Sequence, residues 1–176
     1  SPELKIAERN DLSSNDTFTY QYKDEEYRKV EQKLSENPNS QFSLVPQDWK
    51  DMMYKKFTIT EDMPDIDFSN WNDLGNDFYS IAITDHSEYL KMINNYQAPQ
   101  MSWRNFKYVY AIIIVRASSD NTIDVEDIKT ENGQAYLNVV PSGWLDVAEG
   151  FKYPAICVYV PNYKSLAPNY LQVRAK

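Results

Sequence analysis

The stretch 108–115 constrains the fold of this chain most, because it is apolar at every position and reads Tyr-Val-Tyr-Ala-Ile-Ile-Ile-Val. Successive side chains of a β-strand point to opposite faces of the sheet, so a strand without a polar position needs cover on both sides. The stretch is also far shorter than the roughly 20 apolar residues of a membrane-spanning helix. We therefore predict that 108–115 is a central strand, covered on both faces.

A strand followed by a capped helix precedes this stretch. Residues 79–84 are typical of a strand, and Asp-His-Ser-Glu at 85–88 has the form of a capping box. In that arrangement Asp85 accepts a hydrogen bond from the N–H of Glu88, and Glu88 reaches back to the N–H of Asp85. We predict a helix over 85–95 whose inward residues are Tyr89, Leu90 and Ile93.

The C-terminal half reads as a series of strands. Asn132-Gly133 is a hairpin signal between strands at 122–130 and 136–140, and the phase of Ile128 indicates a bulge in the first of them. Further strands are expected at 155–160 and, as an edge strand, at 171–174. The predicted fold class is therefore α+β: an antiparallel β-sheet meander with a capped helix packed on one face and an N-terminal helical segment.

The N-terminal part divides into two predicted segments. Residues 1–60 are expected to form a helical and irregular segment packed on the main domain, with helices at 24–36 and 47–54. The first helix carries an apolar stripe of Tyr27, Val30 and Leu34, which is suited to cover the free face of the sheet. Residues 61–77 are expected to be an acidic loop, and 78–176 the main α+β domain.

Composition excludes several functions. The net charge is -8 and the basic residues form no run, which argues against nucleic acid and against an anionic membrane surface as partners. The chain has four glycines and no glycine-rich phosphate loop. Its single cysteine, Cys157, lies in an apolar strand, where we expect a buried and inert thiol.

The polar residues do not assemble a catalytic or metal-binding motif. The single histidine, His86, has Ser87 beside it, but adjacent residues in the first turn of a helix point in different directions. The acidic segment starts like a calcium loop at Asp65, yet its sixth position is Asn70 rather than Gly and its twelfth is Asn76 rather than Glu. We predict no catalytic residues, no metal and no cofactor.

Three segments resemble the C-terminal domain of the PrcB-like proteins, which stabilise a surface protease in some bacteria. They are the strand and capped helix at 80–90, the aromatic-led apolar strand at 106–115, and the Tyr-Pro, apolar run and Pro at 152–161. The resemblance spans about 78–162, roughly half of the chain, and departs from the family at 118–123, where a Gly-Gly-Tyr turn is replaced by a glycine-free segment. It implies an extracytoplasmic protein, secreted or lipid-anchored, that binds another protein and has no catalysis of its own.

Aromatic residues in the expected loops are the candidates for binding. If the N-terminal helix closes the sheet, the binding surface falls on loops, so we predict Trp144 with Asp146 and Phe151 on one, and Trp71 with Asp73 on the other. The expected partner is another protein. A carbohydrate-binding module is the alternative, because the same aromatic rings can stack on the sugars of a polysaccharide.

Overall fold

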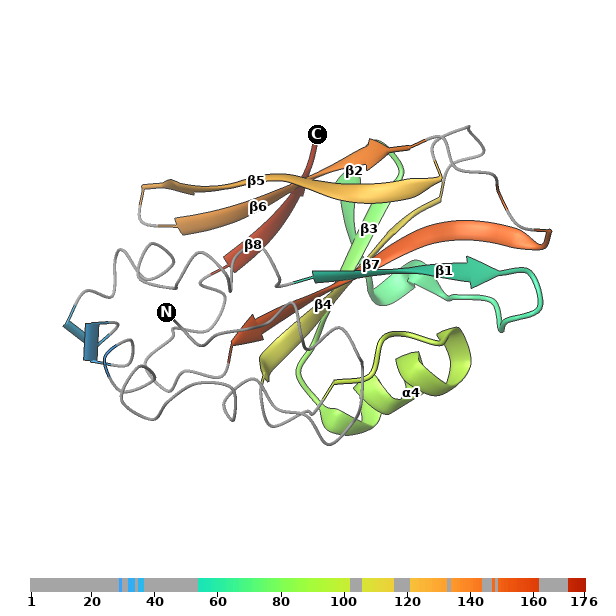
Figure 1. The fold of residues 1–176 in the computed structure, drawn as a ribbon, viewed down its shortest axis with the longest axis horizontal. Coiled ribbons are helices and arrows are strands. Elements are labelled where there is room, and N and C mark those ends of the chain that lie inside the picture. The colour runs from blue at the N-terminus through green and yellow to red at the C-terminus, as the bar shows by residue number, and fades with distance from the viewer. Residues whose placement is uncertain are drawn as a thin grey trace.

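The structure is a computed structural model, and it places strands and one long helix in the order shown in Figure 1. It describes residues 54–101, 106–115, 121–132, 134–143, 147, 149–161 and 171–176, together with Lys29, Gln32, Lys33, Ser35 and Glu36. The elements are β1 (Tyr54–Thr60), the 3-10 helix η3 (Phe68–Asn70), β2 (Asn72–Gly75), β3 (Phe78–Ile83), α4 (His86–Tyr96), β4 (Phe106–Ile114), β5 (Thr122–Glu131), β6 (Gln134–Ser142), β7 (Phe151–Pro161) and β8 (Leu171–Ala175). This content confirms the α+β class.

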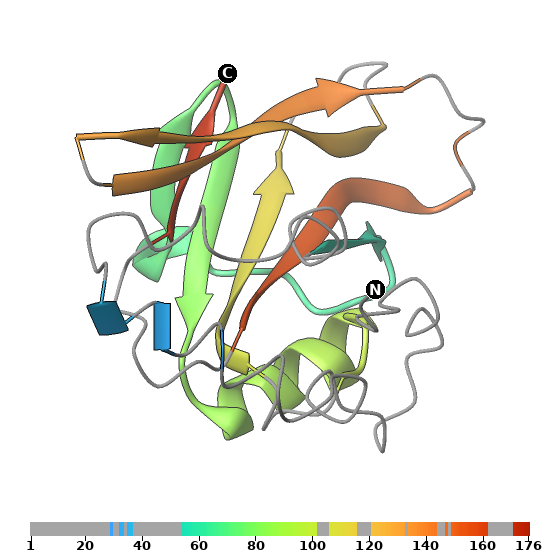
Figure 2. The ribbon, with the colours of Figure 1, turned by 60° about the vertical axis from the view of Figure 1, so that its left-hand side comes forward.

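The strands form two sheets, so the expectation of one antiparallel meander is wrong. The first sheet has the order β1-β7-β4-β3-β2 and is antiparallel throughout, and the second has the order β5-β6-β8. Within the second sheet β5 and β6 pair antiparallel, whereas β6 and β8 pair parallel. Figure 2 shows the second sheet lying over the first. The β5–β6 hairpin leaves the first sheet, and β7 then returns to it beside β4.

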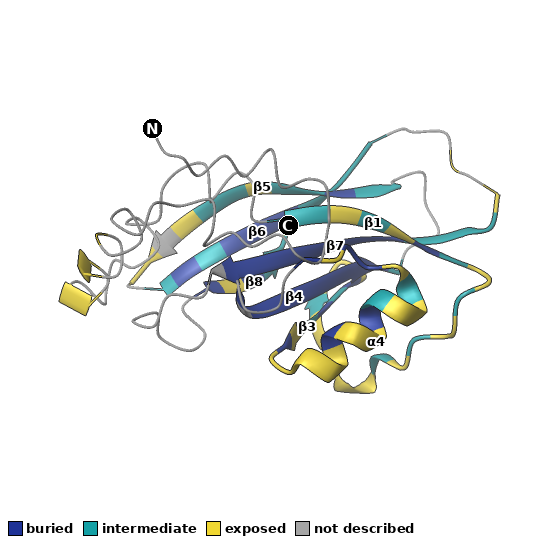
Figure 3. Ribbon diagram, turned by 60° about the horizontal axis from the view of Figure 1, so that its bottom comes forward, coloured by how far each residue is buried: buried dark blue, intermediate teal, exposed yellow. Residues whose placement is uncertain are grey.

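The prediction for the apolar stretch is confirmed. Strand β4 lies between β7 and β3 in the middle of the first sheet, and it is buried on both faces (Figure 3). Tyr110, Ile112 and Ile114 face the second sheet, while Val109 and Ala111 face α4. The chain therefore has two apolar cores, one on each side of the first sheet.

The second sheet supplies the cover that we had assigned to the N-terminal helix. Ile123 of β5, Leu137 of β6 and Val173 of β8 pack against the first sheet in one buried core. The stripe residues Tyr27, Val30 and Leu34 lie outside the residues that the structure describes. The five described residues between 29 and 36 are helical and exposed.

Strand β1 is a strand that the sequence reading missed. It lies in the range that we assigned to the N-terminal segment, yet it pairs with β7 over its whole length. The sequence does carry a strand signal here, because Phe57 and Ile59 alternate with threonines. The signal is short, since the two lysines before Phe57 break the alternation of apolar and polar residues. Similarly, the expected loop 61–77 contains η3 and β2, and β2 pairs with the first half of β3.

Helix α4 forms almost where it was predicted, with a different cap and a different buried face. The Asp85 carboxylate accepts bonds from the Ser87 N–H at 3.1 Å and the Ser87 hydroxyl at 2.8 Å, not from the N–H of Glu88. Glu88 does not reach back but pairs with Lys91 at 3.1 Å. Leu90, expected to point inward, is 42% exposed, because the buried positions Tyr89 and Met92 place it on the outer face.

Candidate binding groove

The groove begins with a local turn that places Trp71 under the first sheet. The Asp67 carboxylate accepts the Ser69 N–H at 3.0 Å and so starts η3, and the Trp71 N–H donates to the carbonyl of Phe68 at 2.9 Å and ends it. The Trp71 ring meets the Phe68 ring edge to face, with 5.1 Å between centroids. Trp71 is half-buried and packs toward the same core as α4.

A cavity of about 290 Å³ lies between this turn and α4, beside the last residues of β3. Its apolar lining comes from three segments: Ile66 and Trp71 from the turn, Ile81 and Ile83 from β3, and Met92 and Tyr96 from α4. We call it the β3–α4 groove. A volume near the lower end of the roughly 300–1,000 Å³ of small-molecule pockets suits one or two side chains of a partner.

The groove opens at a strand edge that the described part of the chain leaves unpaired. Strand β2 pairs with β3 only from Phe78 to Ser80. Beyond that point, 81–83 pairs with β4 on one side, and none of the described strands pairs with it on the other. An open edge next to an apolar hollow is an arrangement that extended peptides can occupy.

Carboxylates dominate the rim of the groove. Hydrogen bonds from Ser69 lower the pKa of Asp67, and hydrogen bonds from Ser87 lower the pKa of Asp85, so both are ionised at neutral pH. Glu88 adds a third carboxylate, and Lys91 is the one ammonium among the groove-lining residues. The rim is therefore negatively charged, in keeping with the net charge of the chain.

The structure brings one of the predicted binding residues, Trp71, into this groove. Asp73 lies on β2, where it is exposed and accepts the N–H of Gly75 at 2.9 Å, so it supports the turn and does not line the groove. Phe151 is the first residue of β7, is half-buried and pairs with Thr60, so it does not line the groove. Trp144 and Asp146 lie outside the described residues.

Sequence reasoning missed Ile81, Ile83, Met92 and Tyr96 as groove residues. It predicted a strand and a helix packed on one face of the sheet, with Tyr89, Leu90 and Ile93 inward, and of these Tyr89 and Ile93 do pack into the core. The short length of β2, which covers only half of β3, is what exposes the groove. The sequence signal for a short hairpin is the Asn-Asp pair that follows Gly75, since these residues favour tight turns. In the structure both have positive φ, 55° and 67°.

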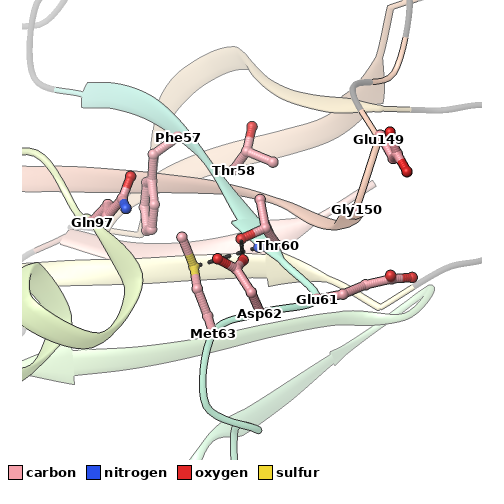
Figure 4. Close-up of a pocket in the computed structure, with 9 residues that line it drawn as sticks. All are labelled: Phe57, Thr58, Thr60, Glu61, Asp62, Met63, Gln97, Glu149 and Gly150. Carbon is pink, nitrogen blue, oxygen red and sulfur yellow. Dashed lines mark hydrogen bonds between the residues drawn. The ribbon is translucent and has the colours of Figure 1, made fainter.

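A second, wider cavity of about 690 Å³ lies at the end of β1 (Figure 4). Hydrogen bonds join some of its lining residues: the Thr60 hydroxyl donates to Asp62, and the Glu61 N–H donates to the carbonyl of Gly150 at 2.7 Å. In Figure 4 the Glu61 side chain extends away from that of Asp62. In the described part of the chain no three His, Cys, Asp or Glu side chains gather in a group that could hold a metal ion.

A buried tyrosine pair holds the segment that follows α4. The Tyr89 hydroxyl donates to the carbonyl of Pro99 at 2.6 Å and accepts the N–H of Met101 at 3.2 Å. The Tyr159 hydroxyl donates to the same Pro99 carbonyl at 3.3 Å. Beside them lies Cys157, which is fully buried as predicted, and burial raises its pKa to about 12. These hydroxyls and this thiol serve packing.

The structure thus defines an α+β domain of two stacked sheets, with an acidic-rimmed apolar groove at one strand edge. No protein-family model, curated protein or solved structure matches the chain. None of the helices in the described residues is both long enough and apolar enough to cross a membrane.

Proposed function

We propose that this chain is a non-enzymatic domain that binds another protein through the β3–α4 groove. The observation that carries the proposal is the coincidence of an apolar hollow, an unpaired strand edge and a charged rim in one place. Isolated exposed apolar residues are common on protein surfaces, but a lined hollow next to backbone groups that can pair is typical of protein recognition.

The engagement of the rim groups favours binding over catalysis. Asp67 and Asp85 each begin a helical turn, and Glu88 pairs with Lys91 at 3.1 Å. A general base or nucleophile needs a neighbour that tunes it for proton transfer, and these carboxylates have helix N–H groups and an ammonium as neighbours instead. We therefore assign no catalytic role and no cofactor to the groove.

The resemblance to PrcB-like proteins supports an extracytoplasmic place of action and a stabilising role. Its three segments correspond to β3 with α4, to β4 and to β7, and β3, β4 and β7 are neighbours in the first sheet. We propose that the protein is secreted or lipid-anchored and that its binding stabilises the partner, as the resemblance implies.

Site-specific photo-cross-linking tests this function. A benzophenone amino acid at Asn95, which lines the groove, should trap a discrete protein in envelope extract of the cells that make the chain. The same probe at Asn94, which is also exposed but does not line the groove, is the matched control. Equal trapping from both positions, or none from Asn95, would contradict the proposal.

A carbohydrate-binding role is the second candidate, because the half-buried Trp71 lines the groove. Titration of the intrinsic tryptophan fluorescence with cell-wall and plant polysaccharides separates the two roles. A spectral shift that disappears in Trp71→Leu would favour sugar binding. Unchanged fluorescence at millimolar sugar leaves the protein-binding role as the better account.

A further inference from the structure

The backbone of one residue, Ala82, faces out of the open edge of β3. The carbonyl of Asp77 accepts the N–H of Val115, next to β4, at 2.9 Å. Because backbone groups alternate between the two sides of an antiparallel strand, those of Tyr79, Ile81 and Ile83 also face β4. The N–H and C=O of Ala82 then point to the other side of β3, beyond Asn72, the first residue of β2.

Side chains of an added strand would reach the groove in a defined pattern. A residue that pairs with Ala82 points its side chain to the same face as Ala82, toward the second sheet. Its two neighbours point to the opposite face, where Ile81 and Ile83 line the groove. An apolar side chain at either neighbouring position would therefore enter the groove between Trp71 and Met92.

The rim determines which charge such a strand carries. Asp85 and Glu88 lie at the start of α4, directly after β3, and Asp67 lies across the groove from them. Three carboxylates against the single ammonium of Lys91 attract a basic segment and repel an acidic one.

We propose that the groove binds an extended peptide segment of a partner protein, which adds a strand to the first sheet by pairing with Ala82. The segment carries an apolar side chain next to the paired residue and a lysine or arginine that reaches the acidic rim. This proposal rests on the protein-binding function above and specifies how the partner is held.

A display library of random linear heptapeptides, selected on the full chain, provides the probe. The selected peptides should share an apolar residue with a lysine or arginine in its neighbourhood. Their synthetic forms should bind Ala82→Pro about tenfold or more weakly, because proline lacks the N–H that the peptide carbonyl needs. Ala82→Val keeps the N–H, so its affinity should stay far closer to that of the wild type than to that of Ala82→Pro. Asn94→Ala, at an exposed position of α4 that does not line the groove, is the control and should bind within about twofold of the wild type.

Amide hydrogen exchange gives a second measurement that does not depend on a variant. Saturation with a selected peptide should slow exchange at Ala82 by about tenfold or more, while Ile81 and Ile83, already bonded to β4, change little. A selection without binders, selection of acidic peptides, equal affinity for Ala82→Pro, or unchanged exchange at Ala82 would each overturn the proposal. If cross-linking from Asn95 still traps a protein in those cases, groove binding stands and strand addition alone has failed.

Discussion

The hydroxyl of Tyr89 offers the sharpest test of the packing beneath the first sheet. Tyr89→Phe keeps the buried ring, which is 1% exposed, and removes one oxygen atom. That oxygen accepts the N–H of Met101 at 3.2 Å and donates to the carbonyl of Pro99 at 2.6 Å. In the variant the Met101 N–H loses its partner in a buried site, while the Pro99 carbonyl keeps the bond from Tyr159 at 3.3 Å.

The expected loss of unfolding free energy follows from this asymmetry. A buried donor without a partner costs roughly 1–3 kcal/mol, so we expect Tyr89→Phe to destabilise the chain by about 2 kcal/mol. Tyr159→Phe is the matched comparison: its hydroxyl donates the longer of the two bonds to Pro99 and also interacts with the side chains of Tyr89 and Cys157, but its removal leaves the bond to the Met101 N–H in place. We therefore expect a smaller loss, about 1 kcal/mol.

Urea denaturation followed by tryptophan fluorescence measures both losses. At roughly 2–4 °C per kcal/mol, thermal unfolding of Tyr89→Phe should shift downward by about 4–8 °C. A loss below about 1 kcal/mol for Tyr89→Phe, or one no larger than for Tyr159→Phe, would refute the assignment of Tyr89 as the residue that holds 98–101.

Three further results are expected. Burial raises the pKa of Cys157 to about 12, so the folded state keeps a proton that the unfolded state releases. The free energy of unfolding should therefore fall as the pH rises from about 9 toward 12, and it should fall less steeply in Cys157→Ala. A thiol reagent should label Cys157 only when the chain unfolds. Asp85→Ala should lower the melting temperature at pH 7, whereas Asp85→Ser should retain most of the cap. Because bonds from Ser87 lower the pKa of Asp85, the difference in melting temperature between Asp85→Ala and the wild type should shrink as the pH falls below about 4. A difference that does not change with pH would contradict this. Lys91→Gln should tighten binding of basic peptides and steepen its salt dependence, since it releases Glu88 from its pair, and unchanged affinity would argue against the charged rim.

Local sequence determined the elements whose signals are contained within a few residues. The unbroken apolar run of 108–115 has no stable alternative to a doubly covered strand, and β4 is one. Asp85 caps a helix with its own neighbour Ser87, a contact that needs no distant residue. The Asn132 turn, with φ of 51°, likewise joins β5 to β6 as its sequence predicts.

Tertiary structure decided which strands meet and what covers the apolar faces. Strand β1 pairs with β7, and β8 joins β6 in parallel, across long separations in the chain. Such pairings depend on how much apolar surface each arrangement buries, which a local pattern does not encode. The apolar faces predicted for β4 needed two covers, and the sequence did not say that a second sheet would be one of them.

The groove shows the same division most clearly. Its lining residues come from the turn at 66–71, from β3 and from α4, and each segment alone has an unremarkable apolar pattern. Trp71 was identified from sequence because it is a large aromatic residue in an expected loop. Ile81 and Met92 were not identified from sequence, which predicted Tyr89, Leu90 and Ile93 as the inward residues of the helix. Their position beside an open edge depends on where β2 begins, at Asn72 directly after η3, and a local pattern does not encode that.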